Sequence, residues 1–142
     1  MADRISAEAR SRNMAQIHSR DTRPERRVRS LLHAAGFRFR LCDKSLPGTP
    51  DIVLRRWHTA IFVHGCFWHR HAGCAKAKIP EAHRDFWEKK LRGNAERDAR
   101  AQAQLRALGW RVIVIWQCEI PALLAEPLPL FRRIRGNENP QE

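Results

Sequence analysis

One short stretch of the chain concentrates the residue types that bind metals and transfer protons. His64–His71, followed by Cys74, contains two cysteines, three histidines and two large aromatic residues. It follows directly on the apolar run Ala60–Val63, which is typical of a strand. A strand ending in such a cluster would hold metal ligands and proton-transfer groups on a rigid support.

Soft metal ligands are available in this stretch and once more downstream. Three cysteines offer thiolates and one of two histidines can offer an imidazole, the candidates being Cys66, Cys74 and Cys118 with His69 or His71. Three thiolates and one imidazole are typical of tetrahedral zinc, and a closed site of this kind is structural. The alternative is that these cysteines are reduced, buried thiols. Cys42, in a polar loop, is interpreted as incidental.

A second constellation could hold a hard cation. Asp51 opens the predicted strand 51–54 after the Gly/Pro-containing loop 45–50. One or two carboxylates, with water and phosphate oxygens, suffice for Mg²⁺. If strand 59–64 is the hairpin partner of strand 51–54, its end brings His64 and then His69 towards Asp51, where an imidazole can deprotonate water. Alternatively, Asp51 is a turn residue and His64 a satisfied, partly buried histidine.

Glu25 has two interpretations. Thr22 can cap a helix whose first turn contains Pro24, and Glu25 three residues on completes a capping box. Capping is a sufficient reason for Glu25, but its carboxylate could instead face water bound to the metal ion.

The elements that must position these residues follow from periodicity. We predict a helix from Thr22 to Gly36, a half-buried strand over 37–41, a helix over 82–108, and a central strand over 110–116. The core contacts expected of the long helix are Phe86, Leu91, Ala95, Leu105 and Leu108. Helix, strands, helix and strand together predict a mixed α/β sandwich around a central sheet.

Size and charge limit the possible functions. The 142 residues suit one domain, and 27 Lys and Arg against 15 Asp and Glu give a net charge of +12, which favours a polyanion such as nucleic acid. We find neither a secretory signal nor an apolar run long enough to cross a membrane, so we expect a cytoplasmic protein. We expect residues 1–20 to form a flexible arm, 21–125 a folded domain, and 126–142 a loosely packed tail.

A set of motifs in a fixed order resembles the very-short-patch repair (Vsr) DNA mismatch endonuclease family. The block Ile61–His69 carries the resemblance most specifically. The other matching motifs are Asn13-Met14, Arg20-Asp21-Thr22, Leu46-Pro47-Gly48, Pro50-Asp51, Phe86-Trp87, Asn94, Glu96-Arg97-Asp98 and Gly109–Val112.

This resemblance implies a restriction-endonuclease-like three-layer sandwich with an added zinc site. It implies that Asp51 and the Val63 carbonyl bind Mg²⁺, that His69 is the general base, and that His64 and Glu25 assist at the phosphate and at metal-bound water. The implied zinc ligands are Cys66, His71, Cys74 and Cys118. Phe67 and Trp68, with Met14 from the arm, would enter the duplex, and Lys90 and Asn94 would lie near the mispaired bases.

The activity so implied is Mg²⁺-dependent nicking on the 5′ side of the T in a T:G mismatch, which arises when 5-methylcytosine deaminates. The expected partner is double-stranded DNA in a bacterial nucleoid, acted on by a monomer that is functionally linked to a cytosine-5 methyltransferase. The alternatives are a less selective nickase or restriction-type enzyme on the same scaffold, and a zinc-stabilised DNA-binding module without catalysis.

Overall fold

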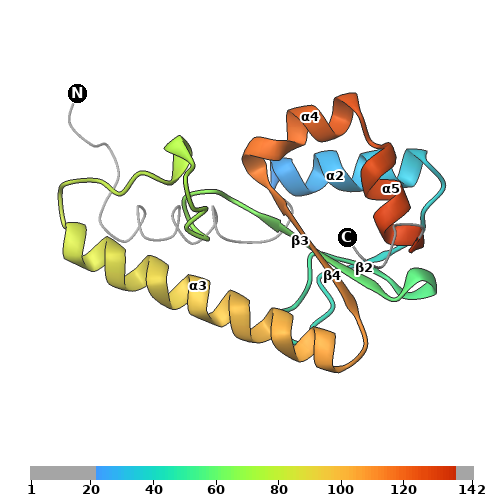
Figure 1. Cartoon of the computed structure of the whole chain (residues 1–142), viewed down its shortest axis with the longest axis horizontal. Coiled ribbons are helices and arrows are strands. Elements are labelled where there is room, and N and C mark those ends of the chain that lie inside the picture. The colour runs from blue at the N-terminus through green and yellow to red at the C-terminus, as the bar shows by residue number, and fades with distance from the viewer. Residues whose placement is uncertain (1–21, 137–142) are drawn as a thin grey trace, which may run out of the picture.

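The computed structural model describes residues 22–136, which form a four-stranded mixed sheet with helices on both faces (Figure 1). In spatial order the strands are β1 (Arg40–Leu41), β2 (Ile52–Leu54), β3 (Thr59–His64) and β4 (Arg111–Trp116). β1, β2 and β3 pair antiparallel, and β4 pairs parallel to β3. The α-helices are α2 (Arg23–Ala34), α3 (Arg84–Ala107), α4 (Ile120–Ala125) and α5 (Leu128–Arg135), and 3-10 turns cover Arg55–Trp57, Ala75–Ala77 and Gln117–Glu119.

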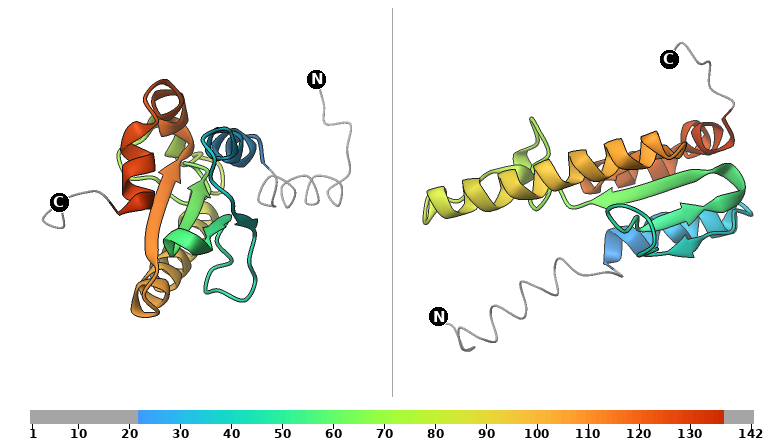
Figure 2. Two further views of the ribbon diagram at one scale, coloured as in Figure 1. Left: turned by 90° about the vertical axis from the view of Figure 1, so that its right-hand side faces the viewer. Right: turned by 90° about the horizontal axis from the view of Figure 1, so that it is seen from below.

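The alternation of side chains along β3 divides the interior into two cores. Ile61 and Val63 pack with apolar residues of α2, α4 and α5, whereas Ala60 and Phe62 pack with Leu105 of α3. The sheet therefore lies between α3 and the other three helices, in three layers (Figure 2). Burial on both faces explains why the strands read as nearly continuous apolar runs. The predicted mixed α/β architecture is confirmed.

The β2–β3 hairpin has the register that the site requires. Ile52 pairs with Ile61 and Leu54 with Thr59, so Asp51, just before β2, lies opposite the Val63 end of β3. The backbone N–H of Cys42 donates to the Asp51 carbonyl at 3.1 Å, which ties the end of β1 to the same point.

The predicted helices are largely correct, with two corrections along α3. The Thr22 side chain accepts a hydrogen bond from the Glu25 N–H at 3.3 Å, as a cap should. On α3, Leu91 and Leu105 are buried as expected, but Phe86 and Leu108 are 58% and 60% exposed. The N-terminal half of α3 runs past the end of the sheet, so Phe86 has no sheet beneath it (Figure 1). No helix within residues 22–136 is both long and apolar enough to cross a membrane.

Two strand predictions need correction. Only Arg40 and Leu41 of the predicted strand 37–41 join the sheet, and Leu41 is 44% exposed. β4 is an edge strand and not a central one. Its apolar character has another cause, because Ile113 and Ile115 face one helical layer while Val112 and Val114 face the other.

The region 126–142, expected to be a loosely packed tail, instead contributes to the core over its described part. α5 buries Leu130, Phe131 and Ile134 against the sheet, and Arg135 lies 5.0 Å from the ring centroid of Phe37. The apolar side chains of α5 recur at helical spacing, and Pro129 sits in the first turn, where a proline is tolerated. Residues 137–142 and the predicted arm, 1–20, lie outside the described residues.

Gly48 fixes how the loop before β2 packs on α3. A Cβ at Gly48 would lie 2.6 Å from the Ala101 Cβ, and the φ angle of Gly48 is +75°. Gly36 also has a positive φ, +95°, but nothing lies within 4 Å of the Cβ it would carry. Gly36→Ala therefore isolates the conformational cost alone.

We expect Gly48→Ala to lower the free energy of unfolding by about 2–4 kcal/mol, because conformational strain and a core clash add. Gly36→Ala should lower it by about 1–2 kcal/mol. Urea denaturation of the two variants, followed by circular dichroism, measures the difference. Equal losses would show that the loop does not press on α3.

Candidate active site and metal centre

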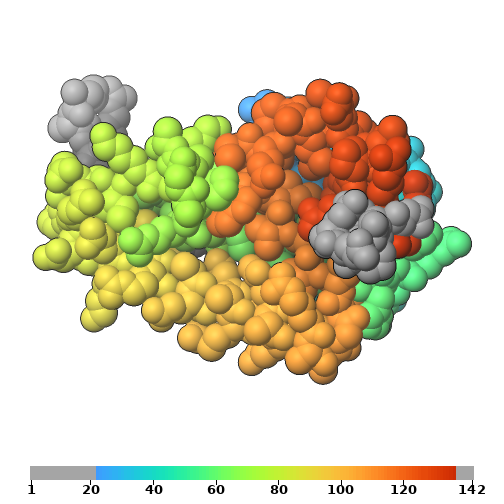
Figure 3. Space-filling model, in the orientation of Figure 1, coloured from blue at the N-terminus to red at the C-terminus, as the bar shows by residue number. Residues whose placement is uncertain are grey.

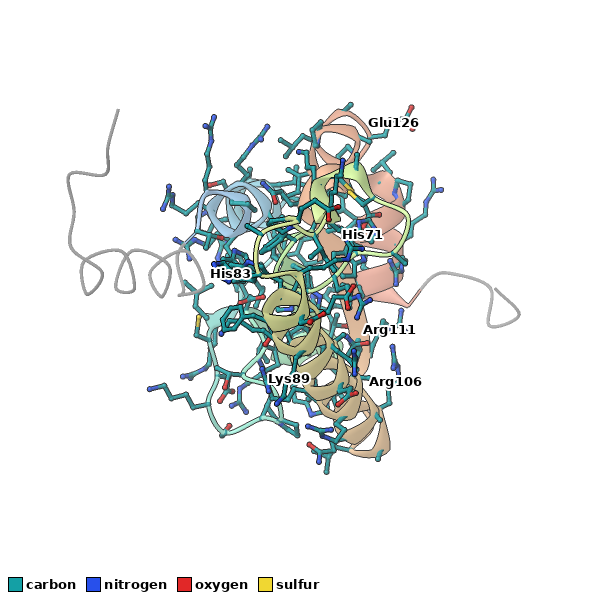
Figure 4. The ribbon with its side chains drawn as sticks, turned by 90° about the vertical axis from the view of Figure 1, so that its left-hand side faces the viewer. His71, His83, Lys89, Arg106, Arg111 and Glu126 are labelled. Carbon is teal, nitrogen blue, oxygen red and sulfur yellow. The ribbon has the colours of Figure 1, made fainter. Side chains whose placement is uncertain are left out.

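A cleft of about 740 Å³ opens between the start of α2, the loop that leads into β2, the end of β3 and the middle of α3. Its lining includes most of the residues predicted to do chemistry, namely Glu25, Asp51, His64, Phe67, Trp68 and His69. The segment after β3 and the N-terminal half of α3 form one end of the molecule (Figure 3). Figure 4 looks onto that end, where His71 on the segment after β3 and Lys89 on α3 are labelled.

Asp51 is held by the backbone across the hairpin. Its Oδ2 accepts a hydrogen bond from the Val63 N–H at 2.7 Å. Burial raises the pKa of Asp51 to about 7, the Val63 N–H opposes that rise, and the Glu25 carboxylate adds to it. A second buried carboxylate so close destabilises the charged form of the first, and a bound cation would stabilise both.

Glu25 lies beside Asp51 and not only at the helix cap. Its side chain is 6% exposed, and a carboxylate oxygen of Glu25, a carboxylate oxygen of Asp51 and the Cys42 Sγ all lie within 4.8 Å of one another. This position is compatible with the interpretation in which the Glu25 carboxylate faces water bound to a metal ion at Asp51. The donor set contains the hard oxygens that Mg²⁺ prefers, so the residues fit this ion.

His69 is oriented by a carboxylate from α3. Its Nδ1 lies 2.6 Å from the Asp98 Oδ2. Because an ionised carboxylate can only accept, Nδ1 carries the proton and Nε2 keeps a lone pair when the ring is neutral. An imidazole held in this way can take a proton from water through Nε2.

His64 lies buried beneath His69. The two rings stack with centroids 3.8 Å apart and an interplanar angle of 5°. The His64 Nδ1 is buried and has no hydrogen-bond partner among residues 22–136, so the alternative of a satisfied strand-end histidine is wrong. The pKa of His64 is lowered to about 4, mainly by burial and to a smaller extent by the neighbouring His69. His64 is therefore neutral near pH 7.

The four side chains that the resemblance assigned to zinc lie together. Ligand atoms of Cys66, His71, Cys74 and Cys118 are all within 4.8 Å of one another, and the Cys118 Sγ lies 3.4 Å from the His71 Nδ1. His69 belongs to the other cluster, so of the two histidines left open it is His71 that lies beside the cysteines. The parallel pairing of His64 with Trp116 brings Cys118 to this point.

The thiols of this cluster influence one another's ionisation. A hydrogen bond from the Lys76 backbone lowers the pKa of Cys74. The pKa of Cys118 is raised to about 11. Desolvation is the main cause, and the neighbouring thiols of Cys66 and Cys74 add to it. Several thiolates at such short separations repel one another, and a divalent cation would remove that cost.

Four aromatic side chains form a separate cluster beside the cleft. Trp87 makes edge contacts with Phe67, Trp68 and Phe86, at centroid distances of 5.4, 5.8 and 5.1 Å. Phe67 and Trp68 are partly exposed and belong to neither apolar core, so ordinary core packing does not explain these two residues. In the sequence, Trp87 belongs to the motif Phe86-Trp87, and the motif by itself indicates no role for this residue.

The predicted base-reading residues have different environments. The Asn94 side chain donates to the Trp68 carbonyl at 3.0 Å and accepts from Arg97, so Asn94 holds the aromatic segment. Lys90, one turn earlier on α3, is exposed. Met14 lies outside the described residues.

Sequence reasoning missed two further residues of the cleft. Asp98 appeared in a family motif without a role, although it lies four residues after Asn94 and so on the same helix face. Cys42 was interpreted as incidental, and no local signal could have placed it beside Asp51, because their proximity depends on the pairing of β1 with β2.

Comparison with known proteins identifies one family of relatives. A family model described as DNA mismatch endonuclease Vsr matches residues 2–76. The type II nicking enzyme V.XorIIP of Xanthomonas oryzae pv. oryzae is 53% identical over 123 residues, which cover 87% of this chain and 90% of that protein. The DNA mismatch endonuclease Vsr of Escherichia coli is 46% identical over 120 residues, which cover 84% of this chain and 76% of that protein. The type II nicking enzyme V.NmeAIP of Neisseria meningitidis is 45% identical over 120 residues, which cover 84% of this chain and 85% of that protein. The chain thus belongs to the Vsr DNA mismatch endonuclease family.

Proposed function

We propose that this protein is a Mg²⁺-dependent, strand-specific DNA endonuclease that nicks on the 5′ side of the T in a T:G mismatch and so starts very-short-patch repair. One observation carries the proposal. The cleft holds a pair of carboxylates, one of them buried, and a carboxylate-oriented histidine next to a partly exposed aromatic cluster. Phosphodiester hydrolysis needs carboxylates that hold a metal ion and a base that activates water. Recognition of a mismatch needs side chains that can enter the duplex. The three-layer arrangement is consistent with a restriction-endonuclease-like scaffold.

His69 is the group that activates water in this proposal. With Nδ1 donating to Asp98, the Nε2 lone pair accepts the proton of the attacking water, and the Asp98 carboxylate stabilises the imidazolium that forms. Asp98 thus orients His69 and favours its protonated form in the transition state. The neutral His64 ring, stacked on His69, limits the movement of the base and assists at the phosphate.

Asp51 and Glu25 are the side chains that would hold Mg²⁺, together with the Val63 carbonyl. When bound, this ion supplies the positive charge that stabilises the negative charge developing on the phosphate. The Val63 N–H keeps Asp51 in place, so the carboxylate need not reorganise during the reaction.

Recognition of the mismatch depends on the aromatic cluster. Inserting Phe67 and Trp68 between base pairs costs a few kcal/mol of stacking, and this cost is lowest at a mismatch. Trp87 and Asn94 support the inserted segment from α3. Lys90 lies on the same helix, near where the mispaired bases would sit, and Met14 of the arm would enter from the other groove. The net charge of +12 supports binding to the DNA backbone.

The runner-up function is a less selective nickase, and substrate comparison separates the two. We expect nicking of a T:G duplex to exceed nicking of the matched duplex by at least about tenfold. A panel with varied flanking bases then defines the sequence context. Equal nicking of matched and mismatched duplexes would establish the runner-up.

Asp51→Asn should slow nicking of the T:G duplex by about a hundredfold or more, because the amide keeps the shape but loses the charge that binds the cation. The rate is measured on a labelled duplex with saturating Mg²⁺. Asp43→Asn is the matched control, because Asp43 is held by Ser45 and Arg55 away from the carboxylate pair. An Asp51→Asn variant as fast as the parent would refute the assigned site and favour a non-catalytic module.

Asp98→Asn should reduce the rate of nicking by about a hundredfold while leaving the affinity for the T:G duplex within about twofold. The amide no longer stabilises a protonated His69, but it does not touch the duplex in this proposal. Fluorescence anisotropy gives the affinity, and Asp85→Asn, near the exposed start of α3, is the control. A parallel loss of affinity and rate would instead indicate a structural role for Asp98.

The Cys66, His71, Cys74 and Cys118 cluster is proposed to bind a structural Zn²⁺. Removing zinc with a chelator should unfold the domain, because the ion connects the segment after β3 to the end of β4. Depleting Mg²⁺ by dialysis should stop nicking without changing the circular dichroism spectrum. A zinc-free protein with an unchanged thermal transition would contradict the structural role.

A further inference from the structure

The cation site proposed above contains a thiol as well as carboxylates. The Cys42 Sγ lies within 4.8 Å of a carboxylate oxygen of Asp51 and of Glu25. The position of Cys42 is fixed by the main chain, since its N–H donates to the Asp51 carbonyl at 3.1 Å. Its side chain lines the same cleft as the two carboxylates.

A thiolate changes which ions such a site prefers. Mg²⁺ takes oxygen ligands and retains several waters, so a sulfur donor adds little to its binding. Zn²⁺ takes sulfur, oxygen and nitrogen together, with ligands of one tetrahedral ion about 3.4–3.6 Å apart. The ligand atoms of the three side chains lie within 4.8 Å of one another, so they would have to approach by at most about 1.4 Å to share one zinc ion.

The same cleft offers a nitrogen donor to such an ion. The His64 Nδ1 is buried and without a partner among the described residues, although His64 lines the same cleft as Asp51 and Cys42. A buried nitrogen without a hydrogen bond is costly and needs an explanation. A neutral imidazole suits zinc well and Mg²⁺ poorly.

We infer that Cys42, with Asp51 and Glu25, forms a second zinc site that overlaps the Mg²⁺ site, so that zinc bound there inhibits nicking. The inference rests on the proposed function for its effect on activity, but not for the binding itself. On binding, the Cys42 thiol releases its proton to solvent, and the ion occupies the carboxylates that Mg²⁺ requires.

The first test measures binding on protein that already holds one zinc in the Cys66–Cys118 cluster. Equilibrium dialysis with metal analysis should show a second zinc per chain, and Cys42→Ser should weaken that second ion by at least about tenfold. Asp43→Asn, which alters the neighbouring carboxylate outside the cluster, should not weaken it. Cd²⁺ in place of zinc should give a larger thiolate charge-transfer absorption in the parent than in Cys42→Ser. If Cys42→Ser bound the second zinc ion as tightly as the parent does, the inference would be overturned.

The second test uses the unaltered chain and so does not depend on a variant folding. In the one-zinc protein, added zinc should slow alkylation of Cys42 by at least about tenfold, as read by peptide mass spectrometry, whereas Mg²⁺ should not. Unchanged alkylation with saturating zinc would overturn the inference.

Nicking assays on the same samples separate the two proposals. Zinc should lower the nicking rate of the parent at concentrations that leave the rate of Cys42→Ser unchanged. Each rate is expressed relative to that of the same protein without added zinc. Nicking of the T:G duplex without Cys42-dependent zinc binding would refute only the second zinc site. Cys42-dependent zinc binding without any nicking would refute only the proposed function.

Discussion

The hydrogen bond from the Val63 N–H to the Asp51 carboxylate is the contact on which the site depends. It exists because the β2–β3 hairpin pairs Ile52 with Ile61, so that the residue before β2 meets the end of β3. A slip of one residue would turn every side chain of β3 to the other face and remove His64 from the cleft. The apolar residues that alternate between two helical layers fix this register, so the packing of the core determines where the chemistry lies.

The two candidate metal sites are adjacent but chemically separate. Trp116 lies between them, stacking on His71 at 4.1 Å and meeting His64 edge-on at 5.1 Å. Within the segment after β3, His69 faces Asp98 whereas His71 faces Cys118. A structural ion at the second cluster would thus hold the segment that carries His69, Phe67 and Trp68 without taking part in the reaction.

Sequence alone predicted those parts of the site that are local in the chain. The hairpin, the cap at Thr22 and the ligand-rich stretch follow from residue spacing, and only the resemblance selected His71 over His69. Asp98, Cys42 and Trp87 could not be assigned roles in this way, because a long helix or a strand pairing brings Asp98 and Cys42 to the cleft and Trp87 to the aromatic cluster beside it. The exposed Phe86 and the buried α5 were mispredicted for a related reason, since periodicity gives the face of a helix but not what lies beneath it.

The distribution of charge explains why binding and cutting can be separate events. The chain carries a net charge of +12, which attracts DNA to the molecule as a whole. The cleft itself concentrates carboxylates, with Asp51, Glu25 and Asp98 all lining it. In the proposed mechanism a phosphate entering that cleft would be repelled until a cation neutralised the carboxylates, whereas the aromatic cluster at the edge of the cleft would engage the duplex without a cation. In the proposed mechanism the ion held by Asp51 therefore decides whether a bound duplex is cut, and the Cys42 thiol beside Asp51 would let zinc compete for that position.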